Sequence, residues 1–172
     1  MTEFEVDNPE TAQGQAMFRE LLYIHGAIRH DLQVVERLAG EVRDGLPPGQ
    51  VRAEIKNLKT NGLLWQLKVN CLRYCRFVHL HHRMEDVAFF PSLRAANPAI
   101  APVVDKLEAD HRAVSDLLDE VEAAAAALGE DDCEASRRHV ADALQTLARS
   151  LLEHLDFEER SAGPTIRRMT GF

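Results

Sequence analysis

The sequence has little of what several classes of protein require. Its 172 residues contain only three cysteines, an odd number that does not suggest a disulfide framework. No run approaches the roughly 20 apolar residues that cross a bilayer, and the acidic start lacks the basic and apolar stretches of a signal peptide. With 20 Lys and Arg against 28 Asp and Glu, no basic stripe is available for phosphates. We therefore expect a cytoplasmic protein that binds neither nucleic acid nor membrane.

Strand-like patterns are also scarce. The 7 prolines and 9 glycines gather in a few breaks, and no segment alternates apolar and polar residues as strands do. Between the breaks, Leu, Ala, Glu and Arg dominate, and these residues form helices well. The sequence predicts helices over 10–43, 63–92, 101–128 and 133–164, with a possible short helix near 51–60. Short connections between such helices favour an all-α, up-down-up-down four-helix bundle. We expect one domain over 1–172, with a core over about 12–168.

What the sequence does have is histidine in a repeated pattern. The unit is a histidine, a glutamate four residues later, an adjacent acid, and a proline ten residues after the histidine. It occurs as His81, Glu85, Asp86 and Pro91, and again as His154, Glu158, Glu159 and Pro164. Two further histidines, His25 and His111, each lie in the first half of a predicted helix. The chain thus reads as two related helical hairpins.

This spacing has a chemical consequence. Residues i and i+4 are neighbours on one helix face, so an imidazole and a carboxylate can point at one ion. Such a donor set suits iron, manganese or zinc better than magnesium or calcium. At about 100° per residue, these side chains share their faces with apolar residues; on the helix over 63–92 the face includes Tyr74, Val78 and Ala88. Buried glutamate is rare unless it is paired or bound to metal. The candidate metal ligands are His25, His81, Glu85, His111, His154 and Glu158.

Several neighbouring residues allow other interpretations. His82 and Asp86 have the same spacing as His81 and Glu85, but the helical wheel places them toward the polar edge, which favours His81–Glu85. Asp86 and Glu159 could orient a ligand imidazole or could be solvated surface acids.

The remaining histidines and two cysteines have simpler interpretations. His30, His79 and His139 are typical of surface positions. Cys71 and Cys75, with His79 four residues further, could form a second metal site, but packing as small apolar side chains is favoured.

On these histidines and glutamates, the sequence resembles the hemerythrin-like, or HHE cation-binding, family over roughly 12–168. The resemblance implies a four-helix bundle with two non-haem iron ions, two bridging carboxylates, and an oxo or hydroxo bridge. It implies that His25 and His81 ligate one iron, that His111 and His154 ligate the other, and that Glu85 and Glu158 bridge them.

The sequence departs from the oxygen-carrying members, whose third helix supplies HxxxH and whose fourth supplies HxxxxD. Ser115 stands four residues after His111, and the fourth helix supplies His154 and Glu158. The arrangement is similar to that of an actinobacterial-type subgroup with an H-HxxxE-H-HxxxE pattern. The loss of a histidine disfavours simple reversible oxygen carriage and leaves room for a ligand such as peroxide.

Two functions are compatible with such a site. One is a catalase-like enzyme that decomposes hydrogen peroxide, with Tyr74 as a candidate catalytic residue that donates a hydrogen bond or traps a radical. In the alternative, Tyr74 packs in the core with its hydroxyl satisfied elsewhere. The other function is non-enzymatic binding or sensing of oxygen, nitric oxide or iron. In either case we expect a small-molecule partner (peroxide, oxygen or nitric oxide) and a monomer or weak homo-oligomer.

Overall fold

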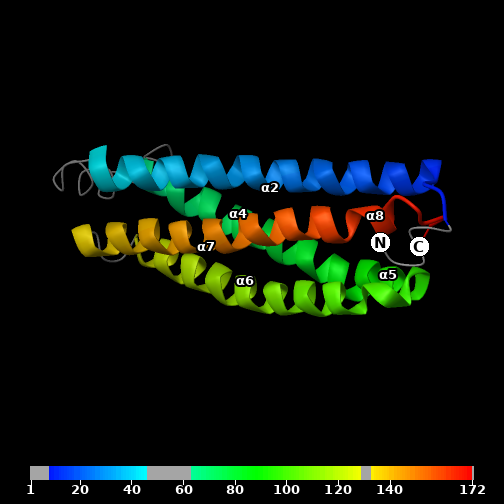
Figure 1. The fold of residues 1–172 in the computed structure, drawn as a ribbon. Helices are drawn as coiled ribbons and strands as arrows, with labels where there is room; N and C mark the ends of the chain where they lie inside the picture. The colour runs from blue at the N-terminus through cyan, green and yellow to red at the C-terminus, as the bar shows by residue number, and fades with distance from the viewer. Residues whose placement is uncertain (1–7, 46–62, 129–132, 172) are drawn as a thin grey trace. The chain divides into compact units, whose positions relative to one another are not determined.

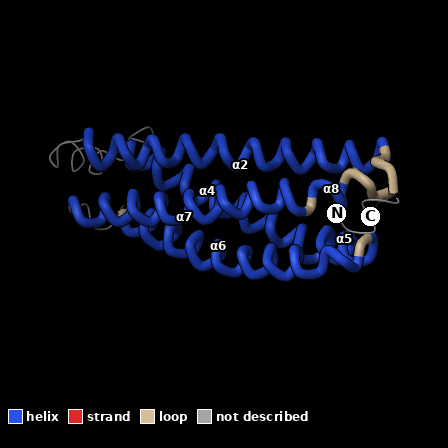
Figure 2. The backbone as a smooth tube through the Cα atoms, viewed as in Figure 1, coloured by secondary structure: helices blue, strands red, loops and turns tan. Residues whose placement is uncertain are grey.

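The computed structural model describes residues 8–45, 63–128 and 133–171. All regular elements in these ranges are helical and are joined by short loops (Figure 2). This confirms the all-α fold class predicted from the sequence. The possible helix near 51–60 lies outside the described residues. None of the described helices combines the length and the apolar character needed to span a membrane.

The predicted long helices are present with shifted ends (Figure 1). In chain order the elements are α2 (Ala12–Gly45), α4 (Leu63–Met84), the π-helical turn η1 (Glu85–Phe89), α5 (Phe90–Ala96), the 3₁₀ turn η2 (Pro98–Ile100), α6 (Ala101–Ala127), α7 (Glu134–Ser161) and α8 (Gly163–Ile166).

The helix expected over 63–92 is not a single α-helix. At η1 the Phe90 N–H donates to the Glu85 carbonyl, five residues back instead of four. Pro91 follows directly; it has no N–H, and its ring would crowd the carbonyl four residues earlier in an α-helix. A widened turn before Pro91 relieves that crowding. The extra residue in this turn changes which side chains face inward after Glu85.

The chain forms two compact units, and the helices α2, α4, α6 and α7 each contribute a segment to both. Unit 1 comprises the described parts of Met1–Ala27, Leu80–Ala113 and Leu151–Phe172. Unit 2 comprises the described parts of Ile28–His79 and Val114–Ser150. Each unit has its own buried apolar side chains.

In unit 1 the helical segments alternate in direction. Thr11, at the start of α2, donates its N–H to the carbonyl of Arg167 just after α8, while His25 further along α2 lies beside Glu158 of α7. Gly14 makes the first of these approaches possible, because a Cβ there would lie 2.4 Å from the Arg167 carbonyl oxygen. Arg94 of α5 donates to Asp105 of α6. Asp86 of η1 lies beside His111, further along α6. The η1–α5 segment and α6 therefore also run in opposite directions, and the up-down order expected from the sequence holds within this unit.

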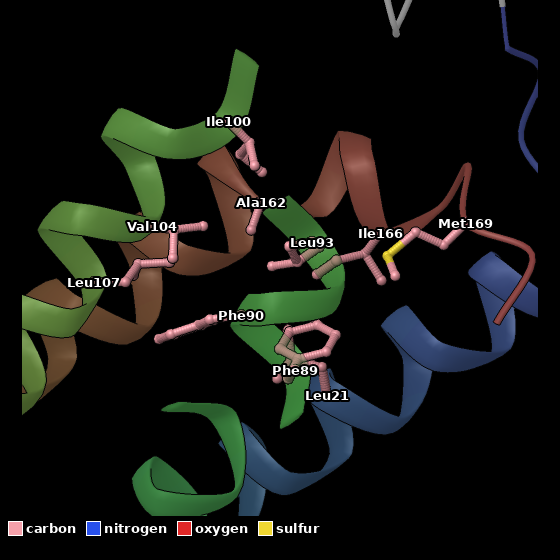
Figure 3. Packing of buried hydrophobic residues seen from close by; sticks show 10 residues of the cluster. All are labelled: Leu21, Phe89, Phe90, Leu93, Ile100, Val104, Leu107, Ala162, Ile166 and Met169. Carbon is pink, nitrogen blue, oxygen red and sulfur yellow. The ribbon is translucent and has the colours of Figure 1, made fainter. Parts of the chain in front are cut away.

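The apolar core of unit 1 closes the bundle around α5 (Figure 3). Phe90 and Leu93 are fully buried between the start of α6 and the end of α7, and Phe89 lies against Leu21 of α2. The other members are Ile100, Val104, Leu107, Ala162, Ile166 and Met169. This apolar cluster lies next to the polar side chains described below.

Unit 2 is an apolar packing unit. Its buried side chains include Leu32, Val78, Leu118 and Leu144, one from each of its four helical segments. Cys71 and Cys75 are also buried there. Burial raises the pKa of both thiols to about 12, which keeps them protonated and agrees with a packing role.

Candidate metal centre

All six predicted ligands are buried, and all lie in unit 1. They come from four helical segments: His25 from α2, His81 and Glu85 from the continuous α4–η1 segment, His111 from α6, and His154 and Glu158 from α7. None exposes more than 8% of its surface. Their donor atoms gather in two neighbouring groups that could each hold a metal ion.

The first group contains two histidines and two glutamates: His25, His81, Glu85 and Glu158, with donor atoms all within 4.8 Å of one another. The Nε2 atom of His25 lies 3.3 Å from Oε2 of Glu158. The Nε2 atom of His81 lies 3.3 Å from Oε1 of Glu85, one helical turn later. Two His-Glu pairs from different segments therefore face each other.

The second group contains three histidines: His82, His111 and His154. The Nε2 atoms of His111 and His154 are 3.1 Å apart. The His82 ring stacks on that of His111, with ring centres 3.9 Å apart. Glu85 connects the two groups, because its Oε2 lies 3.3 Å from Nε2 of His111.

The position predicted for His82 was wrong. The helical wheel placed it toward the polar edge, yet only 5% of its surface is exposed. In unit 1 the end of α4 has two helical neighbours: the His81 ring lies near His25 of α2, while the His82 ring lies on His111 of α6. A helix with two neighbours buries a face wide enough for consecutive residues about 100° apart. The sequence contained one indication of this arrangement, namely that His82 directly follows the predicted ligand His81.

Two carboxylates outside the groups hold ring nitrogens in place. Oε1 of Glu159 lies 2.9 Å from Nδ1 of His25, and Oδ1 of Asp86 lies 2.7 Å from Nδ1 of His111. A carboxylate at Nδ1 favours the proton on that nitrogen and leaves the Nε2 lone pair free to face a cation. Of the two roles left open by the sequence, the geometry agrees with orientation of the imidazoles.

Burial controls the charge of the site. It lowers the pKa of His81 to about 4 and that of His111 to about 2. Charge repulsion from a neighbouring histidine lowers each pKa further, from His25 for His81 and from His154 for His111. Burial also raises the pKa of Glu85 well above its usual value, and the adjacent Glu158 raises it further. The imidazoles of His81 and His111 are therefore neutral, which is the form that ligates metals, and a bound cation would favour the ionised form of Glu85.

A cavity of about 470 Å³ in unit 1 reaches the first group from one side. It lies along the seam between α2 and the α4–η1 segment and touches His81 and Glu85. Most of its lining is apolar: Met17, Leu21, Ile24, Met84, Ala88 and Phe89, with Glu20 as the remaining residue.

Tyr74 lies in unit 2 and belongs to neither group of donor atoms. It is buried, and its hydroxyl makes no hydrogen bond to the described residues. Burial, followed by the charges of Cys75 and Asp31, raises its pKa above the usual value. Its role as a catalytic residue remains a prediction.

The fold and the buried donor atoms define a helical protein with a candidate cation site made of histidine and glutamate. A family model described as hemerythrin HHE cation-binding domain matches residues 64–166. That range is more than half of the chain, so the chain belongs to this family. It includes five of the six predicted ligands but not His25. No curated protein and no solved structure gives a significant match.

Proposed function

We propose that the two groups of donor atoms hold two non-haem iron ions, and that the protein decomposes hydrogen peroxide in a catalase-like way. One observation carries the proposal: buried nitrogen and carboxylate oxygen atoms from four helical segments converge on two adjacent points. The same site could instead bind oxygen or nitric oxide reversibly, and the experiments below separate these functions.

The donor atoms are spaced as ligands of a metal ion, and several of them form no hydrogen bond with one another. Among the described residues, none of the four oxygen atoms of Glu85 and Glu158 takes part in a hydrogen bond, and neither do the Nε2 atoms of His25 and His81. Unpaired polar atoms in a protein interior cost about 1–3 kcal/mol each, more when charged. Two ligands bound at about 2 Å from one ion are about 3 Å apart. The separations of 3.1–3.3 Å between donor atoms are close to that value.

We assign the residues to two positions. His25 and His81 would hold one ion, and His82, His111 and His154 would hold the other. Glu85 and Glu158 would lie between the ions, and Glu85 already reaches both groups. Bound iron supplies Lewis acidity and a store of electrons. The first position has fewer ring nitrogens, and it is the one that the cavity reaches.

The protein's own side chains keep this site ordered and dry. Glu159 and Asp86 fix the orientation of His25 and His111. Phe90, itself fully buried, stacks on the His111 ring with ring centres 5.1 Å apart and covers that face of the ring. Exclusion of bulk water strengthens electrostatic interactions in the site and prevents side reactions. A small oxidant that enters through the cavity would therefore meet His81 and Glu85 at a place from which bulk water is largely excluded.

Metal analysis tests the site. We expect wild-type protein produced with iron to approach two ions per chain, and His81→Ala and Glu158→Ala to lose most of it. His30→Ala and His79→Ala are matched controls, since His30 is exposed and His79 lies in unit 2. Equal iron loss in all four variants would refute the assignment.

Oxygen evolution tests the reaction. Iron-loaded protein should release oxygen from hydrogen peroxide, and the two iron-depleted variants should not. A reversible oxygenated spectrum without oxygen evolution would instead support a carrier or sensor. We propose a monomer or weak homo-oligomer for either function.

A further inference from the structure

The cavity beside the first group is larger and more apolar than hydrogen peroxide requires. A water molecule occupies about 30 Å³ of liquid, and a peroxide molecule is only slightly larger. The cavity measures about 470 Å³, within the range of about 300–1,000 Å³ that is usual for pockets binding organic ligands. Its walls offer thioether, aliphatic and aromatic groups, which do not compensate a small polar solute for lost hydration.

The walls come from two facing helical stripes. Met17, Leu21 and Ile24 lie at i, i+4 and i+7 of α2, and Met84 and Ala88 lie four residues apart on the other side. Ala88 contributes only a methyl group to the lining, and Met84, which also lines the cavity, is 60% exposed. The inner end is firm, since Leu21 and Phe89 belong to the apolar core of unit 1 (Figure 3).

The polar groups of the cavity select against an anion. No lysine or arginine lines it, and Glu20 at its exposed side adds negative charge. At its inner polar point, Nε2 of His81 and Oε1 of Glu85 are 3.3 Å apart. Neither atom forms a hydrogen bond with the described residues. In metal-free protein a neutral hydroxyl or hydroperoxide group could bond both atoms, whereas a carboxylate would lose its hydration among apolar walls that offer no basic side chain.

We propose that this cavity binds a neutral apolar molecule ending in a hydroperoxide or hydroxyl group, with that group at His81 and Glu85 and the hydrocarbon part along Met17, Leu21 and Phe89. The class of substrate is thus an organic hydroperoxide, in addition to hydrogen peroxide; two hydroperoxide molecules would give two alcohols and one O₂, with one molecule oxidised and the other reduced, so that no further reductant is needed. The inference deepens the proposed function and rests on it for the chemistry, because in iron-loaded protein the bound group would lie beside the proposed first metal position.

Binding can be measured without any reaction by using cumyl alcohol, the unreactive alcohol that corresponds to cumene hydroperoxide. In protein labelled with ¹³C at the methionine methyl groups, we expect saturable shifts of the Met17 and Met84 signals. The Met169 signal should stay in place, because Met169 is buried in the apolar core and does not line the cavity. Saturable shifts that spare Met17 and Met84 would overturn the proposal, and so would the absence of any shift.

Two comparisons test the shape and the neutrality of the cavity. Ala88→Phe should weaken binding at least tenfold, whereas Ala113→Phe, at an exposed position of α6 in unit 1, should leave it unchanged; circular dichroism checks that both variants fold. In metal-free protein, the carboxylate analogue 2-methyl-2-phenylpropanoate should bind at least tenfold more weakly than cumyl alcohol. The proposal would be contradicted if cumyl alcohol bound equally well to the Ala88→Phe and Ala113→Phe variants. It would also be contradicted if the alcohol and the carboxylate analogue bound equally well.

The failure of this inference can be separated from that of the proposed function. The titrations are run on both metal-free and iron-loaded protein. Iron binding without cumyl alcohol binding refutes only the organic substrate. Cumyl alcohol binding by protein that takes up no iron refutes the di-iron assignment and leaves the cavity as an apolar binding site.

Discussion

At the scale of single residues, the site depends on which atoms of each side chain face inward. Nδ1 of His25 and of His111 is occupied by a carboxylate, so Nε2 of each ring faces the donor groups. The sequence predicted the six ligand candidates because His and Glu at i and i+4 stay on one face as long as the helix is regular. It did not predict His82, since a single-stripe wheel takes no account of two helical neighbours.

His82 provides the sharpest residue-scale prediction. We expect His82→Ala to lower the affinity of the second position at least tenfold, because the position would retain two of its three ring nitrogens. Bound iron should fall toward one ion per chain, measured by metal analysis after dialysis.

His139→Ala is the matched control for this change. His139 is exposed on α7 and lies in unit 2, away from the donor groups. Unchanged iron content and affinity in His82→Ala would mean that His82 is only a packing residue stacked on His111.

At the scale of helices, the π-helical turn η1 explains where the sequence-based expectation failed. A helical wheel advances about 100° per residue, and this rotation applies to the regular α-helix that ends before Glu85. The wide turn that follows changes the register: Ala88, expected on the buried stripe, is exposed, and Phe89 and Phe90 are buried instead. The motif through Glu85 was thus predictable, but the cavity wall at Ala88 was not, because hydrophobic periodicity does not reveal a five-residue turn.

The close approach between α2 and the segment after α8 provides a prediction at this scale. Gly14→Ala would place a Cβ 2.4 Å from the Arg167 carbonyl oxygen, and backbone atoms cannot give way as a flexible side chain can. We expect a loss of about 1–3 kcal/mol in the free energy of unfolding, measured by urea denaturation.

Gly26→Ala and Gly40→Ala serve as controls within the same helix, since a Cβ at either position meets nothing within 4 Å. Each should be stabilised by roughly 0.5–1 kcal/mol, as expected when alanine replaces glycine inside a helix. A Gly14→Ala variant as stable as these two would show that α2 can shift away from Arg167 at little cost.

At the scale of the whole molecule, chemistry and apolar packing are separated between the two units. Unit 1 carries both groups of donor atoms, the cavity and an apolar core, while the buried residues of unit 2 are mainly aliphatic. The positions of His25, His81, His111 and His154 along their helices predict that the metal site lies toward one end of the bundle, but the boundary between the units is not predictable, because each long helix contributes to both. The division becomes visible only when contacts between distant segments are known.

This division predicts a regional response to metal removal. In metal-free protein, the carboxylate oxygens of Glu85 and Glu158 lie in the interior of unit 1 without a hydrogen bond to the described residues, and contacts such as His25–Glu159 and Asp86–His111 join its segments without the links that a bound ion would add. A ligand that binds only the folded state stabilises it by about 2.7 kcal/mol at a hundred times its dissociation constant. Hydrogen exchange followed by mass spectrometry should therefore become at least about tenfold faster in peptides covering 80–89, 105–113 and 151–161 after chelation.

Peptides covering 28–42 and 114–127 in unit 2 should change much less, because they contain no donor atom of either group. Glu158→Ala protein, which is expected to bind no iron, should not respond to the chelator. Equal acceleration in both units of the wild-type protein would indicate that the metal stabilises the chain as one cooperative unit and not through local links in unit 1.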